Sequence, residues 1–201
     1  MKHNYISRKK DPLTKTQYYF LTKESKETLW NLKDVNRRLL RRVYEDIDGK
    51  EVFVNHKLFV AQIFFYFEDL TKNKIDLSFY TETDLSKFRY LLHPKPDAFI
   101  SMQGAGKDVK RYFLEVIDQG TPKFAKENLI KRYSDYSTDG DWEEKTKFPF
   151  PDLFIVCPNE NSLKHLYSYI SEEFDGDFAI YLTIKDKIKT GAGLEIWQEV
   201  K

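Results

Sequence analysis

The sequence has one cysteine in 201 residues, with only eight glycines and seven prolines. A single thiol excludes an internal disulfide bond and is typical of a reducing compartment. No apolar run approaches the roughly 18 to 20 residues of a membrane span, and the charged N-terminus lacks the pattern of a signal peptide. We therefore expect a cytoplasmic protein with no membrane partner, built from long regular elements with few flexible linkers.

Net charge is also nearly absent, because 33 Lys and Arg residues balance 32 Asp and Glu residues to give +1. The chain as a whole is therefore not predicted to attract nucleic acid. The distribution is uneven, however: residues 1–50 contain 13 basic and 7 acidic residues (13 − 7 = 6), whereas residues 51–201 contain 20 and 25. This contrast predicts a basic N-terminal extension over 1–50 and a separate domain over 51–201.

Four arginines stand out in the basic extension. A helix predicted from Asp34 to about Tyr44 carries Arg37, Arg38, Arg41 and Arg42. Spacings of one and four place them on one broad face of that helix. Two interpretations remain open: the face binds DNA phosphates, or it is an ordinary solvated surface.

Apolar residues make up 41% of the chain, with 16 Phe and 13 Tyr, which is enough for a substantial core. Residues 53–70 form the longest apolar stretch without Pro or Gly, and they predict a helix packed on a sheet. His56 near its start is interpreted as a structural histidine. Cys157, at the end of the run 153–157, is predicted to be a small buried apolar residue rather than a catalytic thiol.

The remaining elements are predicted from apolar periodicity and turn residues. The pattern predicts strands over 17–21, 75–80, 97–102, 111–118, 152–157 and 178–184, helices over 24–32, 122–136 and 159–173, a polar loop over 137–147, and loosely ordered residues 1–13. A glycine-rich turn at 103–106 joins two of the strands as a hairpin, while helices join the later ones. The predicted fold class is therefore α/β, with a mixed central sheet flanked by helices.

Two acids lie at matching ends of the predicted hairpin. Asp97 begins one strand and Glu115 lies towards the end of the other. Because the start of one antiparallel strand lies beside the end of its partner, the two carboxylates are expected to be neighbours. Close carboxylates repel unless a cation or proton lies between them, and Mg²⁺ favours such ligands. This arrangement favours metal-assisted phosphodiester hydrolysis. The alternative is that the acids cap a turn or pair with lysine.

These residues resemble the core of the PD-(D/E)XK nuclease superfamily. From about residue 53 onwards the chain is similar to the replication-relaxation family of plasmid and mobile-element proteins. The similarity rests on 54–56 at the start of the apolar helix, Glu82, 96–97, 114–115, 118–121, the helix with Lys131 and Tyr133, 150–156, and Trp197. Residues 16–26 resemble the last strand of that family's winged helix and the segment after that strand. The resemblance implies a restriction-endonuclease-like fold, with Asp97 and Glu115 as ligands of Mg²⁺ and a partial winged-helix remnant in 1–50.

One position departs from the nuclease pattern. The family lysine two residues after the second acid is replaced by Ile117. Strand alternation also places Asp118 on the face opposite Glu115 and Ile117. The resemblance then assigns the lysine role to Lys131 on the following helix, with Glu82 or Asp118 assisting, and adds Tyr133 to the arginines as a DNA contact.

Two hypotheses account for these features. The first is a nuclease-fold DNA-binding accessory protein of plasmid or mobile-element replication or mobilisation, with a degenerate active site and replication or mobilisation proteins as partners. The second is an active Mg²⁺-dependent DNA endonuclease or nickase. The isoleucine at position 117 and the near-neutral charge favour the first.

Overall fold

The computed structural model describes residues 4–10, 17–38, 40–41, 51–72, 75–104, 106, 108–191 and 193–200. Its contacts divide the chain into two units, Met1–Asn55 and His56–Lys201. The division falls near residue 50, where the charge distribution changes. Predictions for Arg42 and for the rest of 42–50 lie outside the described residues.

The N-terminal unit contains a two-stranded antiparallel ribbon and a short helix. Its elements are β1 (Ile6–Lys10), β2 (Gln17–Leu21) and α1 (Lys23–Trp30). Thr22 caps α1, because its side chain accepts a hydrogen bond from the Ser25 amide. The prediction that residues 6–10 are loosely ordered is wrong. They pair with β2 through a register from Ile6–Leu21 to Lys10–Gln17.

The larger unit is built on a six-stranded mixed sheet in the order β3-β4-β5-β6-β7-β8. The strands are β3 (Ile75–Thr81), β4 (Ala98–Gly104), β5 (Lys110–Val116), β6 (Asp152–Cys157), β7 (Ile180–Ile184) and β8 (Gln198–Glu199). Strands β5, β6 and β7 are parallel neighbours, whereas the outer pairs are antiparallel. The predicted α/β class with mixed pairing is confirmed.

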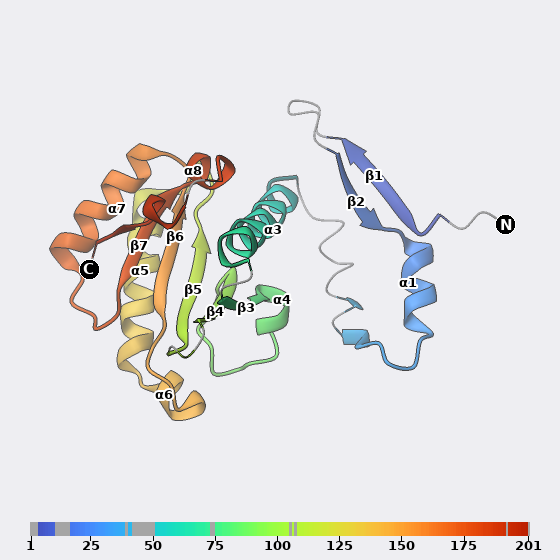
Figure 1. Ribbon diagram of the computed structural model, residues 1–201, viewed down its shortest axis with the longest axis horizontal. Helices are drawn as coiled ribbons and strands as arrows, with labels where there is room; N and C mark the ends of the chain where they lie inside the picture. Colours follow the sequence, from blue (N-terminus) through green and yellow to red (C-terminus); the bar gives the residue numbers. More distant parts are fainter. Residues whose placement is uncertain are drawn as a thin grey trace. The chain divides into compact units, whose positions relative to one another are not determined.

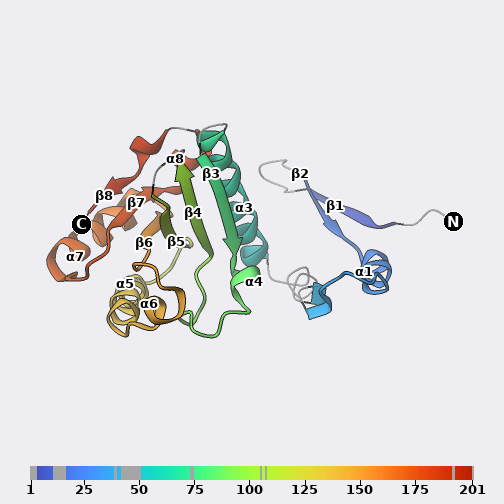
Figure 2. The same cartoon turned by 60° about the horizontal axis from the view of Figure 1, so that its bottom comes forward.

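Helices cover both faces of this sheet (Figures 1 and 2). They are α3 (Glu51–Thr71), α4 (Glu82–Leu85), α5 (Lys123–Thr138), α6 (Asp141–Thr146), α7 (Glu160–Glu173) and α8 (Lys185–Lys189), with the 3₁₀ turn η1 (Leu194–Ile196). Helix α3 lies on one face, and α5 and α7 lie on the other. The predicted loop over 137–147 instead contains α6, which Trp142 anchors in the core.

Each face has its own apolar core. On one face α3 buries Phe59, Val60, Ile63, Tyr66 and Phe67, which recur at helical spacing. Trp197 closes this core by stacking on Phe67, with ring centroids 5.9 Å apart. Strand β6 is covered on both sides, and for that reason its sequence reads as a continuous apolar run.

Cys157 at the end of β6 is fully buried, as predicted. Burial raises the pKa of its thiol to about 12, so the thiolate needed for nucleophilic chemistry is not accessible near neutral pH. None of the described helices combines the length and apolar character needed to cross a membrane.

Candidate acid and histidine site

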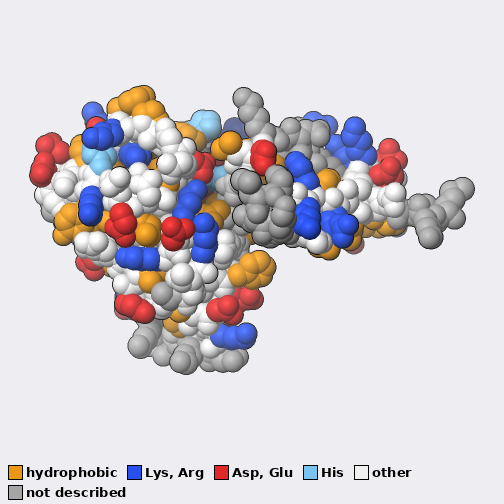
Figure 3. Space-filling model, turned by 90° about the horizontal axis from the view of Figure 1, so that it is seen from above, with side chains coloured by type: hydrophobic (Ala, Val, Ile, Leu, Met, Phe, Trp, Pro, Cys, Tyr) orange, Lys and Arg blue, Asp and Glu red, His pale blue; other side chains and the backbone are white. Residues whose placement is uncertain are grey.

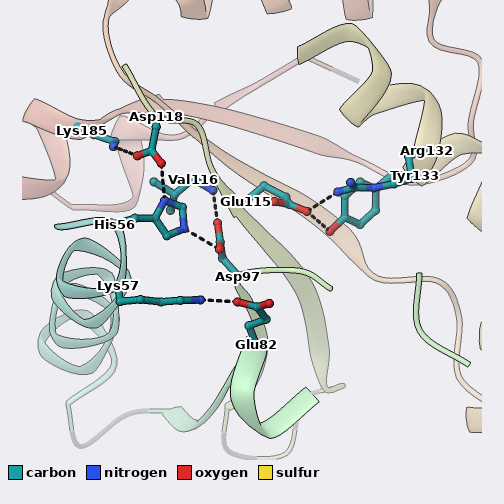
Figure 4. Close-up of polar contacts among 10 residues, drawn as sticks. All are labelled: His56, Lys57, Glu82, Asp97, Glu115, Val116, Asp118, Arg132, Tyr133 and Lys185. Carbon is teal, nitrogen blue, oxygen red and sulfur yellow. Dashed lines mark hydrogen bonds and ion pairs between the residues drawn. The ribbon is translucent and has the colours of Figure 1, made fainter. Parts of the chain in front are cut away.

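The sheet register brings the two predicted acids to opposed positions. Ala98 of β4 pairs with Leu114 of β5, so Asp97 and Glu115 each lie one residue beyond that pair. Their side chains nevertheless diverge (Figure 4): the Asp97 carboxylate turns towards α3, and the Glu115 carboxylate turns towards α5. Divergent carboxylates do not form a shared ligand set, so each acid has to be considered with its own partners.

Both carboxylate oxygens of Asp97 have partners. Oδ1 lies 2.7 Å from Nε2 of His56, in the second turn of α3, and Oδ2 accepts a hydrogen bond of 2.8 Å from the Val116 amide. The His56 and Asp97 side chains are only 14% and 12% exposed. Such a shielded, hydrogen-bonded pair is held much more firmly than a surface ion pair.

His56 bridges two acids from different parts of the sheet. Its Nδ1 lies 2.9 Å from Oδ2 of Asp118, which comes directly after β5 and Ile117. Burial alone would lower the pKa of His56, but hydrogen bonds to and charges on Asp97 and Asp118 outweigh burial and raise it. An imidazole that donates to carboxylates from both ring nitrogens must carry both protons. His56 is therefore a cation at the centre of this site.

Asp118 has a second basic partner. Nζ of Lys185, the first residue of α8, lies 3.0 Å from Oδ1 of Asp118. The Ile117 side chain packs on the opposite core, with α5 and α7, so the predicted alternation between Ile117 and Asp118 is confirmed. Ile117 is 5% exposed and fills core volume where the nuclease pattern has a lysine.

Glu115 is sequestered on the α5 side of the sheet. Its Oε1 accepts hydrogen bonds from Arg132 at 2.9 Å and from the Tyr133 hydroxyl at 2.8 Å. Burial, and after it the negative charge of Asp97, raises the pKa of Glu115 to about 8, although Arg132 and Tyr133 oppose that shift. Glu115 is thus largely protonated at neutral pH, and a protonated carboxylic acid is a poor Mg²⁺ ligand.

Glu82 also has a basic partner. It begins α4 and forms an ion pair with Lys57 of α3. This pair is more exposed than the Asp97 pair, with 27% of the Lys57 side chain and 43% of the Glu82 side chain accessible. All four predicted acids are therefore matched by a base from another element, as Figure 4 shows.

The other predicted residues lie partly in the larger unit and partly in the N-terminal unit. Lys131 is exposed and lines a cleft with Arg89, whereas its neighbour Arg132 reaches Glu115. Tyr133 has no exposed surface, so the structure gives it an internal role in holding Glu115 rather than a surface for DNA. Among the predicted arginines, Arg37, Arg38 and Arg41 are exposed in the N-terminal unit. The Arg37 guanidinium lies 5.6 Å from the Trp30 ring centroid.

The donor arrangement does not fit a Mg²⁺ ion shared by Asp97 and Glu115. Asp97 already binds a cationic imidazole and a backbone amide, and Glu115 faces the other side of the sheet in protonated form. Among the described residues, no three His, Cys, Asp or Glu side chains are arranged to hold a metal ion. The site as built is a network of internal ion pairs.

Sequence reasoning misses the bases of this network. It gives His56 only a structural role, and it assigns no role to Arg132 or Lys185. For Arg132 a signal exists, because the buried positions Ile130 and Tyr133 fix the phase of α5 and point Arg132 nearer to the sheet than Lys131. For Lys185, 67 residues from Asp118, the sequence offers none.

Comparison with known proteins adds no relative. No protein-family model matches the chain, and a search of the curated proteins found no match to it.

Proposed function

We propose that this protein is a DNA-binding accessory protein with a restriction-endonuclease-like core that does not cleave DNA. The β1–β2 ribbon carries the DNA contact, and the acid cluster of the larger unit serves as an internal structural network. The resemblance to replication-relaxation proteins assigns the protein to plasmid or mobile-element replication or mobilisation, with proteins of those complexes as partners.

The observation that carries this proposal is the exposed face of the β1–β2 ribbon. Arg8 lies opposite Tyr19 in the register, Lys10 lies opposite Gln17, and all four are exposed. The ribbon strands contain no acid, and Tyr19 is 65% accessible. Cations that neutralise phosphates, next to an aromatic ring, are the groups with which proteins hold a nucleic-acid strand.

The distribution of charge also supports DNA binding by the N-terminal unit rather than by the larger unit. In Figure 3 the larger unit shows acidic and basic side chains intermixed, whereas the visible charged side chains of the N-terminal unit are mainly basic. Exposed Arg37, Arg38 and Arg41 extend that basic character beyond the ribbon. A local positive surface on a nearly neutral chain gives DNA affinity that falls steeply with salt.

The pairing of the acids accounts for the absence of cleavage. Metal-assisted hydrolysis needs carboxylates that converge on a cation and a nearby base or lysine. Here His56, Lys57, Arg132 and Lys185 hold the carboxylates, and Ile117 occupies the lysine position. These protein cations neutralise Asp97, Asp118 and Glu82 without a metal, and Arg132 holds the protonated Glu115.

The test is the affinity for a fluorescein-labelled DNA duplex, measured by anisotropy over a series of salt concentrations. Wild type is expected to bind at low salt, with affinity falling linearly on a log–log plot. Arg8→Ala/Lys10→Ala should weaken binding and reduce the slope by about 0.9 for each phosphate that the variant no longer neutralises. The matched control Lys123→Ala/Lys164→Ala removes two exposed lysines from α5 and α7 and should leave the slope unchanged. Failure of wild type to bind at low salt contradicts the proposal.

A further inference from the structure

A polar cleft of about 510 Å³ opens beside α5, away from the bases on the α3 side of the sheet. One wall is a single stripe of α5, formed by Asn128, Lys131, Arg132, Asp135, Tyr136 and the capping residue Asp139. These positions recur at intervals of three and four, so they share one face of the helix. The segment 89–92 and Asp141 of α6 also line the cleft. The volume lies within the range of small-molecule sites.

Two polar atoms in the cleft wall lack partners. The Arg132 Nε and the Tyr136 hydroxyl are buried and have no hydrogen-bond partner among the described residues. Tyr136 is only 6% exposed, and burial raises the pKa of its hydroxyl well above the ordinary value, so it remains a neutral donor. Leaving a buried donor without an acceptor destabilises the folded state. Because neither atom has accessible surface, a ligand in the cleft supplies the missing acceptors only when the two side chains turn towards it.

The charges of the cleft are arranged in two groups. Lys131 and Arg132 lie just past the middle of α5, and Arg89 adds a third cation from the segment 89–92. The acids follow them: Asp135 lies one turn later in the stripe, Asp139 ends the stripe, and Asp141 lies beyond it in α6. Eight residues separate Lys131 from Asp139, which corresponds to about 12 Å along a helix. A ligand that matches these charges has an anionic group at the cations and hydroxyl or amino donors at the acids. The distance between its two parts is about the length of one nucleotide.

The cleft also contains an aromatic surface. Tyr90 is partly exposed, and its ring contacts the rings of Phe88 and Trp142, with centroids 5.8 and 6.4 Å away. Leu91 and Leu92 are buried next to it. A ring held in place in this way offers a surface on which a nucleobase stacks.

Contacts beneath the cleft fix the Arg132 side chain in place, and this prepares it to bind an anion. Its terminal nitrogen is fixed on Glu115, which Tyr133 also holds. Because burial raises the pKa of Glu115, this acid does not fully neutralise the guanidinium at neutral pH. An anchored guanidinium with a spare donor is the type of group that binds phosphate in a fixed geometry.

We propose that this cleft binds a nucleoside monophosphate, with the phosphate on Arg89, Lys131 and Arg132 and the nucleoside donors on Asp135 and Asp139. The Tyr136 hydroxyl donates to the ligand, and Tyr90 supports the base. The same chemistry is offered by a free nucleotide and by the 5′-phosphorylated end of a nucleic-acid strand. The inference does not depend on DNA binding by the β1–β2 ribbon, because no ribbon residue lines the cleft.

The experiment is calorimetric titration of the intact protein with AMP, inorganic phosphate and adenosine as separate ligands. AMP is expected to bind more tightly than either part alone. Exposed Arg89 and Lys131 allow substitution with little risk to the fold, and Arg89→Ala and Lys131→Ala should each weaken AMP binding about tenfold. Tyr136→Phe removes only the hydroxyl and should weaken binding about fivefold. Lys123→Ala, an exposed lysine on α5 outside the cleft, should bind AMP like wild type.

A second pair of titrations distinguishes the two sources of the ligand. A short single-stranded oligonucleotide is compared with and without a 5′-phosphate. A preference for the phosphorylated strand that Lys131→Ala abolishes identifies a strand end, whereas binding of AMP alone identifies a free nucleotide. Absence of binding by both AMP and the phosphorylated strand at millimolar concentration overturns the proposal. Binding that Arg89→Ala and Lys131→Ala leave unchanged, or inorganic phosphate binding as tightly as AMP, also overturns it.

Discussion

His56 Nε2 lies 2.7 Å from Oδ1 of Asp97, which places a cationic imidazole against the first acid of the nuclease-like pattern. The other ring nitrogen of His56 lies 2.9 Å from Asp118. One histidine therefore joins the start of α3 to acids that flank two strands. In this protein a histidine holds Asp97, one of the two carboxylates that the nuclease pattern would use to bind a metal ion.

Removing the imidazole leaves two shielded carboxylates close together without their cation. His56→Ala is therefore expected to lower the free energy of unfolding by about 2 to 3 kcal/mol, somewhat less than for a fully buried pair because the Asp118 side chain is 35% exposed. Urea denaturation followed by circular dichroism measures this change. The control is His93→Ala at an exposed position, which should have little effect. Equal stabilities of the two variants would contradict the central role of His56.

The stabilisation by His56 should depend on pH. Its folded-state pKa is raised above the ordinary value of 6.5, so the contribution is fully present below pH 6.5 and is lost as the pH rises through the folded pKa. The difference in unfolding free energy between wild type and His56→Gln should therefore be larger at about pH 6 than above the folded pKa. A difference that grows with pH would contradict the assigned charge.

Glu115 should also make stability fall as the pH rises. In the unfolded chain it ionises near 4.5, whereas the folded protein retains its proton up to about 8 because of burial. The folded state thus binds more protons between these values, and stability falls as pH rises, by up to about 1.4 kcal/mol per pH unit for one proton. Glu115→Gln keeps an acceptor for Arg132 and Tyr133, so its denaturation profile should be flatter than that of wild type over this window. Parallel profiles would show that Glu115 is ionised in the fold.

Glu82 provides the contrasting case. Its pair with Lys57 is partly solvated, so Glu82→Gln should change the free energy of unfolding by less than about 1 kcal/mol. The effect should shrink further in high salt, because salt screens exposed pairs. A decrease as large as that of His56→Ala would mean that the acids act as one coupled network, and a double-mutant cycle with Lys57→Met measures that coupling.

Most of the larger unit could be predicted from the sequence, because its elements are strongly apolar. The run of β6 is buried on both faces, and the stripe of α3 recurs at helical spacing. Strand β1 could not be predicted, since its sequence Ile-Ser-Arg-Lys-Lys is polar and becomes a strand only by pairing with β2. Helix α6 could not be predicted either, because it is short and polar.

The acids of the site could be found by sequence reasoning, whereas their partners could not. An acid at the end of an apolar strand is visible in the sequence, as Asp97 and Glu115 show. Whether it binds a metal or a base depends on side chains brought from other elements. His56 is 41 residues from Asp97, and no local pattern relates the two.

Whether the protein binds DNA without cleaving it is measured by the migration of supercoiled plasmid on an agarose gel. The plasmid is first incubated with the protein and Mg²⁺ or Mn²⁺. The gel reports binding as retardation and cleavage as conversion to the nicked or linear form. We expect retardation at low salt that weakens with added salt and with Arg8→Ala/Lys10→Ala, and no conversion to the nicked or linear form. Nicking by wild type that Asp97→Ala or Glu115→Gln abolishes would contradict the account and establish an active nuclease.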